Sequence, residues 1–241
     1  MRFVPVKTAS MQAVLALHRA RQSFVKARTA QANQIRGLLA EFGIVIAEGI
    51  GHIEVRLPEI VEDGENGLPG MMRELLQRRG ENLKDMDRQV GEVERQIKLW
   101  HRDNEQSRVL EAIPGIGPIG ASAMVATLGD AKSFKNARQV PAWLGIVPRH
   151  EGTGGKAKLG PISKRGDVYL RTLLIHGARS VIAHFERKPD QADEWLKRLL
   201  ARRNKNIAAV ALAAKTARIA WALLAHERSY QHDYVVARKA A

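Results

Sequence analysis

The chain has 241 residues, of which 45% are hydrophobic, enough for one large domain or two small ones. Lys and Arg number 39 against 25 Asp and Glu, and this net charge of +14 favours a phosphate backbone as partner over an anionic membrane surface or simple solubility. Because cysteine is absent, disulfides, thiolate zinc sites and cysteine nucleophiles are excluded. The N-terminus is not a signal peptide and no run of 18 apolar residues occurs, so we expect a cytoplasmic protein without a membrane span.

A long helix is predicted from about Met11 to Phe42, because apolar residues recur at helical spacing and Gly43 marks its end. Its other face carries a basic stripe: Arg19, Arg21, Lys26, Arg28 and Arg36. Such a stripe suits a nucleic-acid backbone and, equally, a solvated helix face.

Residues 43–70 are interpreted as an irregular surface connection, because six glycines alternate there with Pro58 and Pro69. The acidic residues of this stretch, Glu54 among them, invite a metal site. A flexible acidic loop is favoured instead, because nothing in the sequence fixes their geometry.

From Met71 to about Leu110 the pattern predicts a long charged helix with an apolar seam at roughly heptad intervals. This helix suits an antiparallel hairpin with another long helix, a coiled-coil arm or a dimer contact.

The segment Ile113–Asp130 contains Pro114-Gly115-Ile116-Gly117 followed by a helix of small residues. This pattern is typical of helix-hairpin-helix elements, in which the turn presents backbone N–H groups to a DNA phosphate. Gly115 and Gly117 are therefore candidate nucleic-acid-binding residues. A tight turn between helices, without any ligand, is the alternative.

A glycine-rich basic loop then leads from Arg149 into a helix predicted from Asp167 to about Phe185. Its cations favour phosphate binding, and the spacing of its glycines matches neither a Walker loop nor a dinucleotide fingerprint. A solvated basic linker is the alternative. The candidate nucleic-acid-binding residues here are Arg149, Lys156, Lys158, Lys164, Arg165 and Arg171.

We therefore expect a mostly α fold: a long helical, coiled-coil-like arm followed by a compact helical domain with a helix-hairpin-helix-like element. One or two small strands are expected near residues 2–6 and 144–163. Three regions are expected, residues 1–46, 47–110 and 111–241.

Several motifs in this order resemble one family: I-P-G-I-G-P, A-W-L-G-I-V-P-R, G-T-G-G-K and L-G-P-I-S-K-R-G-D. The run from Ile113 to Ser180 resembles the C-terminal transposase domain of the DEDD-type insertion-sequence transposases, the one-ten family with its one-triple-one subgroup. Residues 1–46 resemble the end of that family's RuvC-like domain and the start of its helical insertion.

The resemblance implies DNA cleavage and rejoining, with a RuvC-like carboxylate cluster that holds metal and a nucleophilic serine. It also implies a homo-oligomer, nucleoid-associated in the cytoplasm, and in some members a guide (bridge) RNA. The carboxylates would precede Arg2, so we expect a truncated copy with no metal ligand and no cofactor. Mg²⁺ is expected only with the missing RuvC-like domain.

Relatives commonly have S-S-G-G-K or S-T-G-G-K where this chain has Gly152-Thr153-Gly154-Gly155-Lys156. The candidate nucleophiles are consequently Ser163 and Thr153. Ser163 lies beside Lys164 and Arg165, and Thr153 lies close to Lys156, so cations that would neutralise the attacked phosphate are near each hydroxyl. An N-cap or turn hydroxyl is the alternative for Ser163.

The sequence thus predicts an insertion-sequence transposase, with a non-catalytic nucleic-acid-binding or dimerisation module as the alternative. A helix-hairpin-helix repair protein is a third interpretation, against which the motifs after Arg149 argue.

Overall fold

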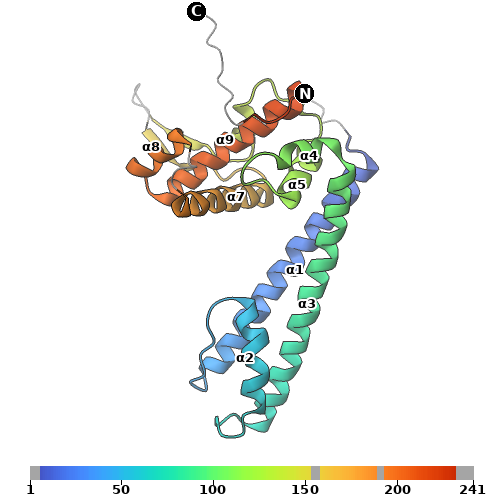
Figure 1. Ribbon diagram of the computed structural model, residues 1–241, viewed down its shortest axis with the longest axis vertical. Helices are drawn as coiled ribbons and strands as arrows, with labels where there is room; N and C mark the ends of the chain where they lie inside the picture. Colours follow the sequence, from blue (N-terminus) through green and yellow to red (C-terminus); the bar gives the residue numbers. More distant parts are fainter. Residues whose placement is uncertain (1–5, 153–157, 189–192, 232–241) are drawn as a thin grey trace, which may run out of the picture. The chain divides into compact units, whose positions relative to one another are not determined.

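The computed structural model describes residues 6–152, 158–188 and 193–231, and it confirms a mostly α fold with two short strands (Figure 1). The chain divides into two compact units. Residues 16–97 form the inserted unit, and residues 1–15 together with 98–241 form the main unit. This division differs from the expected limits at 46/47 and 110/111, because the chain leaves the main unit within the first helix and re-enters it within the third.

The inserted unit is built on helices α1 (Ala9–Ala40) and α3 (Gly70–Asp103), which run antiparallel through residues 16–97 (Figure 1). Arg21 forms an ion pair with Glu94 at 2.7 Å, and Arg28 forms one with Asp87. The partner numbers fall along α3 as they rise along α1, as the antiparallel hairpin predicted from the sequence requires.

Helix α2 (Ile50–Glu62) lies where the sequence analysis expected an irregular connection, so that expectation was wrong. Ile53, Leu57 and Ile60 are buried at helical spacing, and their burial outweighs the helix-breaking tendency of Pro58 inside α2. Gly80 of α3 allows close packing here, because an added Cβ would lie 2.9 Å from the Leu57 Cδ2 atom.

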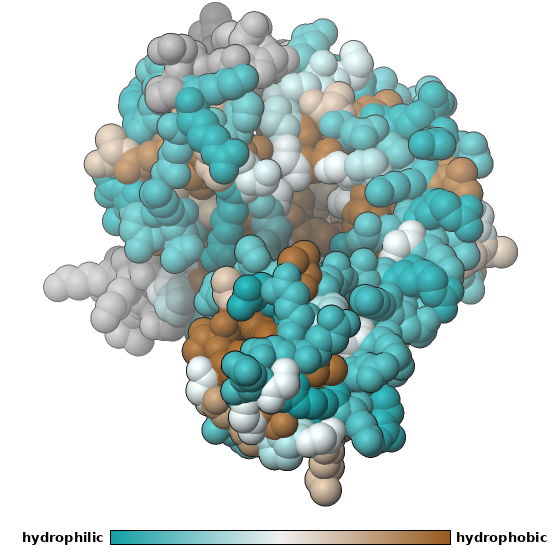
Figure 2. Space-filling model, turned by 60° about the horizontal axis from the view of Figure 1, so that its bottom comes forward, coloured by the Kyte–Doolittle hydropathy of each residue, from teal (hydrophilic) through white to brown (hydrophobic). Residues whose placement is uncertain are grey.

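The basic stripe of α1 is largely used inside the inserted unit. Besides the two ion-paired arginines, Arg36 donates hydrogen bonds to the Ala47 carbonyl at 3.1 Å and the Gly49 carbonyl at 2.6 Å. These contacts hold the segment that follows α1. The face of the molecule shown in Figure 2 is mainly hydrophilic, with apolar patches among the hydrophilic residues.

The main unit contains the remaining elements. In chain order they are α4 (Glu105–Glu111), α5 (Pro118–Leu128), η1 (Ala131–Ser133), α6 (Gln139–Trp143), β1 (Pro148–Glu151), β2 (Lys158–Ile162), α7 (Val168–Arg187), α8 (Glu194–Arg202) and α9 (Lys205–His226). The helix predicted from Met71 to Leu110 is broken at Asn104, whose side chain accepts a hydrogen bond from the Ser107 N–H and caps α4.

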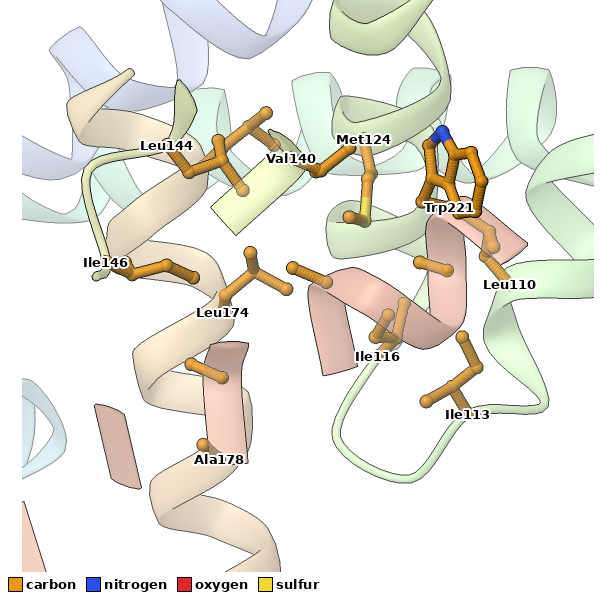
Figure 3. Packing of buried hydrophobic residues seen from close by; sticks show 14 of the residues in the cluster. Leu110, Ile113, Ile116, Met124, Val140, Leu144, Ile146, Leu174, Ala178 and Trp221 are labelled. Atoms are coloured by element: carbon orange, nitrogen blue, oxygen red, sulfur yellow. The ribbon is translucent and has the colours of Figure 1, made fainter. Parts of the chain in front are cut away.

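The core of the main unit lies around the alanine-rich helix α9, which packs along α7. Figure 3 shows Leu110, Met124, Leu174 and Trp221 converging from four helices. By length and composition alone α9 could cross a membrane. Its alanines are buried in this core, however, as in the central helix of a globular domain.

The residues before α1 are bound to the main unit through Lys7. Its ammonium donates hydrogen bonds to the carbonyls of Ala126, at 2.6 Å, and Thr127, at 2.8 Å. Burial lowers the pKa of this ammonium, and the two carbonyls at the C-terminal end of α5 compensate for part of its lost hydration.

Acidification should destabilise the inserted unit through His18. Burial and the neighbouring charge of Arg21 lower the pKa of His18 to about 4, whereas the unfolded chain binds the proton near the ordinary value of 6.5. The stability is thus present above pH 6.5 and is lost as the pH falls towards 4, by up to about 3 kcal/mol. The free energy of unfolding can be measured at pH 6.5 and at pH 4 by urea unfolding followed by circular dichroism. Its decrease between the two pH values should be smaller in His18→Gln than in the parent or in the exposed-site control His52→Gln. An equal difference in all three proteins would exclude His18 as the cause.

Candidate nucleic-acid interface

The site is built on a close crossing of two backbone segments, residues 143–147 before the β1–β2 hairpin and residues 163–167 after it. We call this the glycine crossing. The Ser163 N–H donates to the Val147 carbonyl and the Lys164 N–H to the Gly145 carbonyl, each at 3.0 Å. These bonds continue the antiparallel pairing of β1 and β2 towards α7.

Two glycines make this crossing possible. Gly145 has φ +70°, and an added Cβ there would lie 2.6 Å from the Arg165 nitrogen. A Cβ on Gly166 would lie 2.1 Å from the Trp143 carbonyl oxygen. Neither position can accept a larger residue without separating the two segments.

The side chain of Arg171, in α7, binds to both segments of the glycine crossing. The residue is 8% exposed, and its Nη1 donates hydrogen bonds to the Leu144 carbonyl at 3.0 Å and the Gly166 carbonyl at 3.3 Å. We expected Arg171 to bind a phosphate directly. Its burial and its bonds to both segments instead give it the role of an anchor, because buried guanidinium groups are retained where they satisfy backbone acceptors.

Asp167 caps the helix that follows. Its side chain accepts a hydrogen bond from the Leu170 N–H at 2.8 Å, so the N-cap interpretation of Ser163 was wrong. Ser163 is half-buried and lies five residues before α7 begins at Val168. A turn hydroxyl or a nucleophile remains open for it.

Three of the predicted cations, Arg149, Lys164 and Arg165, are exposed around the crossing. In the described part of the chain none of them forms an ion pair, in contrast to Lys132, Lys197 and Lys205 elsewhere in the main unit. Lys164 has φ +55°, an uncommon backbone conformation for a non-glycine residue. Cations without acidic partners are available to an external anion.

The other predicted residues of the loop are not placed. Lys158 lies at the start of β2, where only its backbone is described. Thr153 and Lys156 lie outside the described residues.

The turn between α4 and α5 forms a second feature on α7. Gly115 has φ +85°, and a Cβ on Gly177 of α7 would lie 2.0 Å from the Gly115 carbonyl oxygen. A shallow depression beside it is lined by residues 111–117 together with His176, Gly177 and Ser180. Gly117 is exposed and is the N-cap of α5, with no side-chain cap. Helix packing thus accounts for Gly115, while phosphate binding by this turn stays a prediction.

Two features of the site were missed in the sequence. Trp143, which is 42% exposed and whose carbonyl lies against Gly166, was not singled out as a candidate residue. The pairing of Gly145 with Gly166 was missed because the two residues lie far apart in the sequence.

The crossing should not tolerate an added methyl group. Gly166→Ala places its Cβ against the Trp143 and Leu144 backbone, and we expect a loss of about 3 kcal/mol or more. Gly117→Ala is the matched control, because its Cβ meets no atom within 4 Å. All four tryptophans lie in the main unit, so their fluorescence during urea unfolding reports on that unit. Equal midpoints for both variants would contradict the close crossing.

Residues 107–195, which contain both the α4–α5 turn and the glycine crossing, match the family model described as Transposase IS116/IS110/IS902 family. The chain is 49% identical over 232 residues to a probable family 20 transposase of Pseudomonas aeruginosa, covering 96% of this chain and 69% of that protein.

Two further relatives are named transposases of insertion sequences. The one for element IS1111A of Coxiella burnetii is 42% identical over 96% of this chain, and the one for element IS1328 of Yersinia enterocolitica is 41% identical over 92%. The chain spans 64% and 65% of their lengths, somewhat less than two thirds. By its sequence, this chain belongs to the IS116/IS110/IS902 family of insertion-sequence transposases.

Proposed function

We propose that the main unit binds DNA at the glycine crossing and acts there in the transposition of an insertion sequence. The observation that carries this function is the group of exposed cations, Arg149, Lys164 and Arg165, without acidic partners in the described residues and inside the region that matches the transposase family. Backbone phosphates are the ligands that such a group attracts irrespective of base sequence. The protein would act in the cytoplasm, in association with the nucleoid.

The chemistry proposed for the site is attack of a side-chain hydroxyl on a DNA phosphate. The oxygen of Ser163 or Thr153 forms a bond to phosphorus, and the bond from phosphorus to one sugar oxygen breaks. The attacking hydroxyl loses its proton to solvent water, and the sugar oxygen leaves with the electron pair and takes up a proton from solvent. Attack by the sugar hydroxyl of a second strand would release the side chain and join the two DNA segments. The neighbouring Lys164 and Arg165 would stabilise the charge that develops on the phosphate.

Three further components follow from the family resemblance and belong to the same proposal. A RuvC-like carboxylate cluster would hold Mg²⁺, a guide RNA would select the target, and a homo-oligomer would bring two DNA partners together. Among the described residues no group of three His, Asp or Glu side chains lies close enough to hold a metal ion. The residues that the structure describes therefore offer no fitting set of metal ligands, and no metal-dependent step is derived from them.

A second candidate function is nucleic-acid binding without catalysis. It is favoured by Asp167, the carboxylate nearest to Lys164 and Arg165 in sequence, because its side chain is engaged in capping the Leu170 N–H. A module of this kind would bind DNA or RNA and leave both strands intact.

Removal of the crossing cations should weaken DNA binding and its dependence on salt together. The association constant K falls as the salt concentration rises. Each of Lys164→Ala and Arg165→Ala should make the plot of log K against log[salt] less steep by about 1, since one fewer counterion is released on binding. Fluorescence anisotropy with labelled duplex DNA between about 50 and 200 mM salt measures this slope. Lys205→Ala is the matched control, because Lys205 is paired with Glu186 at 2.6 Å. Unchanged affinity in both crossing variants would remove this surface from DNA binding.

The nucleophile is identified by a covalent adduct. Incubation of the protein with end-labelled DNA carrying an insertion-sequence end, followed by denaturing electrophoresis, should show a protein–DNA species that is lost in Ser163→Ala or in Thr153→Ala. Lys164→Ala should only reduce its yield. An adduct that persists in both hydroxyl variants would exclude both residues, and salt-sensitive binding without any adduct would favour the non-catalytic function.

A further inference from the structure

Trp143 differs from the other tryptophans of the main unit. The Trp221 indole is buried and donates to the Ala131 carbonyl at 2.9 Å, and the Trp100 indole donates to the Ser10 hydroxyl at 2.8 Å. The ring of Trp195 is covered by the Lys215 ammonium, 4.4 Å from its centroid. Within the described residues, Trp143 has no hydrogen-bond or cation partner of this kind, and it is 42% exposed. An exposed tryptophan of this size calls for an explanation, because burial of its ring would be favourable.

The backbone of Trp143 is held rigidly at the glycine crossing. Trp143 is the last residue of α6, and the next residue, Leu144, is fully buried. The Trp143 carbonyl lies against Gly166, so close that an added Cβ would overlap it. Gly166 directly follows Lys164 and Arg165, so the exposed indole and these two exposed side chains extend from neighbouring backbone segments.

One side of the indole is used in the fold. Trp143 and Phe134 form a T-shaped pair with ring centroids 5.7 Å apart and planes at 68°. This contact restricts the ring without enclosing it, so an exposed aromatic surface remains on a residue whose backbone contacts Gly166.

We propose that Trp143 is a stacking platform for an unpaired nucleobase of the strand whose phosphates bind to Lys164 and Arg165. This role rests on the DNA-binding function proposed above and adds the ligand class that the site selects, a single-stranded or locally unpaired nucleic acid. A basic groove combined with an aromatic ring is the arrangement by which proteins bind unpaired strands, since every base offers a π face.

The charges around the ring favour a nucleic acid over a second copy of this chain. Lys164 and Arg165, which form no ion pair in the described part of the chain, directly precede Gly166, the residue that the Trp143 carbonyl contacts, and the whole chain carries a net charge of +14. Contact between two identical copies at this face would bring like charges together. A polyanion instead neutralises them.

Stacking and phosphate binding are separable by their dependence on salt. Loss of the indole removes a contact with a base but does not change how many counterions the nucleic acid releases on binding. The slope of log K against log[salt] should therefore stay unchanged, while the affinity falls at every salt concentration. Loss of Lys164 or Arg165 should change the slope itself.

The test uses the full chain and a labelled single-stranded oligodeoxyadenylate of about 12 nucleotides, within the range of known single-strand site sizes. Trp143→Ala should weaken binding about 5- to 100-fold, the loss typical for one stacked base, whereas Trp143→Phe should retain most of the affinity. A strand of equal length and charge with abasic nucleotides should bind equally well to the parent and to Trp143→Ala. The parent's tryptophan fluorescence should be quenched by the base-containing strand, and this part of the quenching should be absent in Trp143→Phe.

Three outcomes would overturn the stacking role. The first is unchanged affinity for the base-containing strand in Trp143→Ala while Lys164→Ala and Arg165→Ala bind more weakly, which would leave the DNA-binding function standing. The second is equal weakening on the abasic strand, which would show that the substitution acts through the structure of the crossing. The third is a shift towards monomer in light scattering with unchanged affinity, which would assign the indole to a contact between copies. If none of the variants at positions 143, 164 and 165 changes binding, both the stacking role and the proposed DNA-binding function at this site are contradicted. Should Trp143→Ala fail to fold, as thermal unfolding would show, Trp143→Leu replaces it in every comparison.

Discussion

The close approach of two backbones at the glycine crossing is the constraint on which the described site depends. Gly145 and Gly166 have no Cβ, so the segment that enters the β1–β2 hairpin and the segment that leaves it lie in direct contact. Arg171 donates to a carbonyl on each side and so joins both segments to α7. A mobile basic loop would have to be ordered on binding, at a cost in conformational entropy. Here the backbones that carry Lys164, Arg165 and Trp143 are ordered before any ligand arrives.

Helix α7 relates the two features of the candidate interface. Its N-terminal end is capped by Asp167 and carries Arg171, whereas Gly177, further along, receives the turn between α4 and α5. Both contacts need glycine for the same reason, namely that a backbone carbonyl occupies the space of a Cβ. The family model covers both, and the chemistry proposed for the site would be arranged along this one helix.

Much of the fold could be predicted from apolar periodicity. Helices α1 and α7 lie within a few residues of their expected limits, because long amphipathic runs have few alternatives. Helix α2 was missed since Gly49, Gly51 and Pro58 are ordinary signals of a loop. Only the burial of Ile53, Leu57 and Ile60 shows that tertiary packing overrides those signals. Arg171 was assigned to the ligand for a related reason, because sequence gives the charge of a side chain but not whether it faces solvent or the backbone.

The docking of Lys7 on the last carbonyls of α5 has a topological consequence. Residues 6–15 belong to the main unit although the next 82 residues, 16–97, belong to the other, so the inserted unit interrupts a fold whose two parts are far apart in the chain. During synthesis the main unit cannot close until the ribosome has passed residue 127. If a protease cut the inserted unit, residues 6–15 would stay on the main unit through non-covalent contacts alone, as in a fragment-complemented protein.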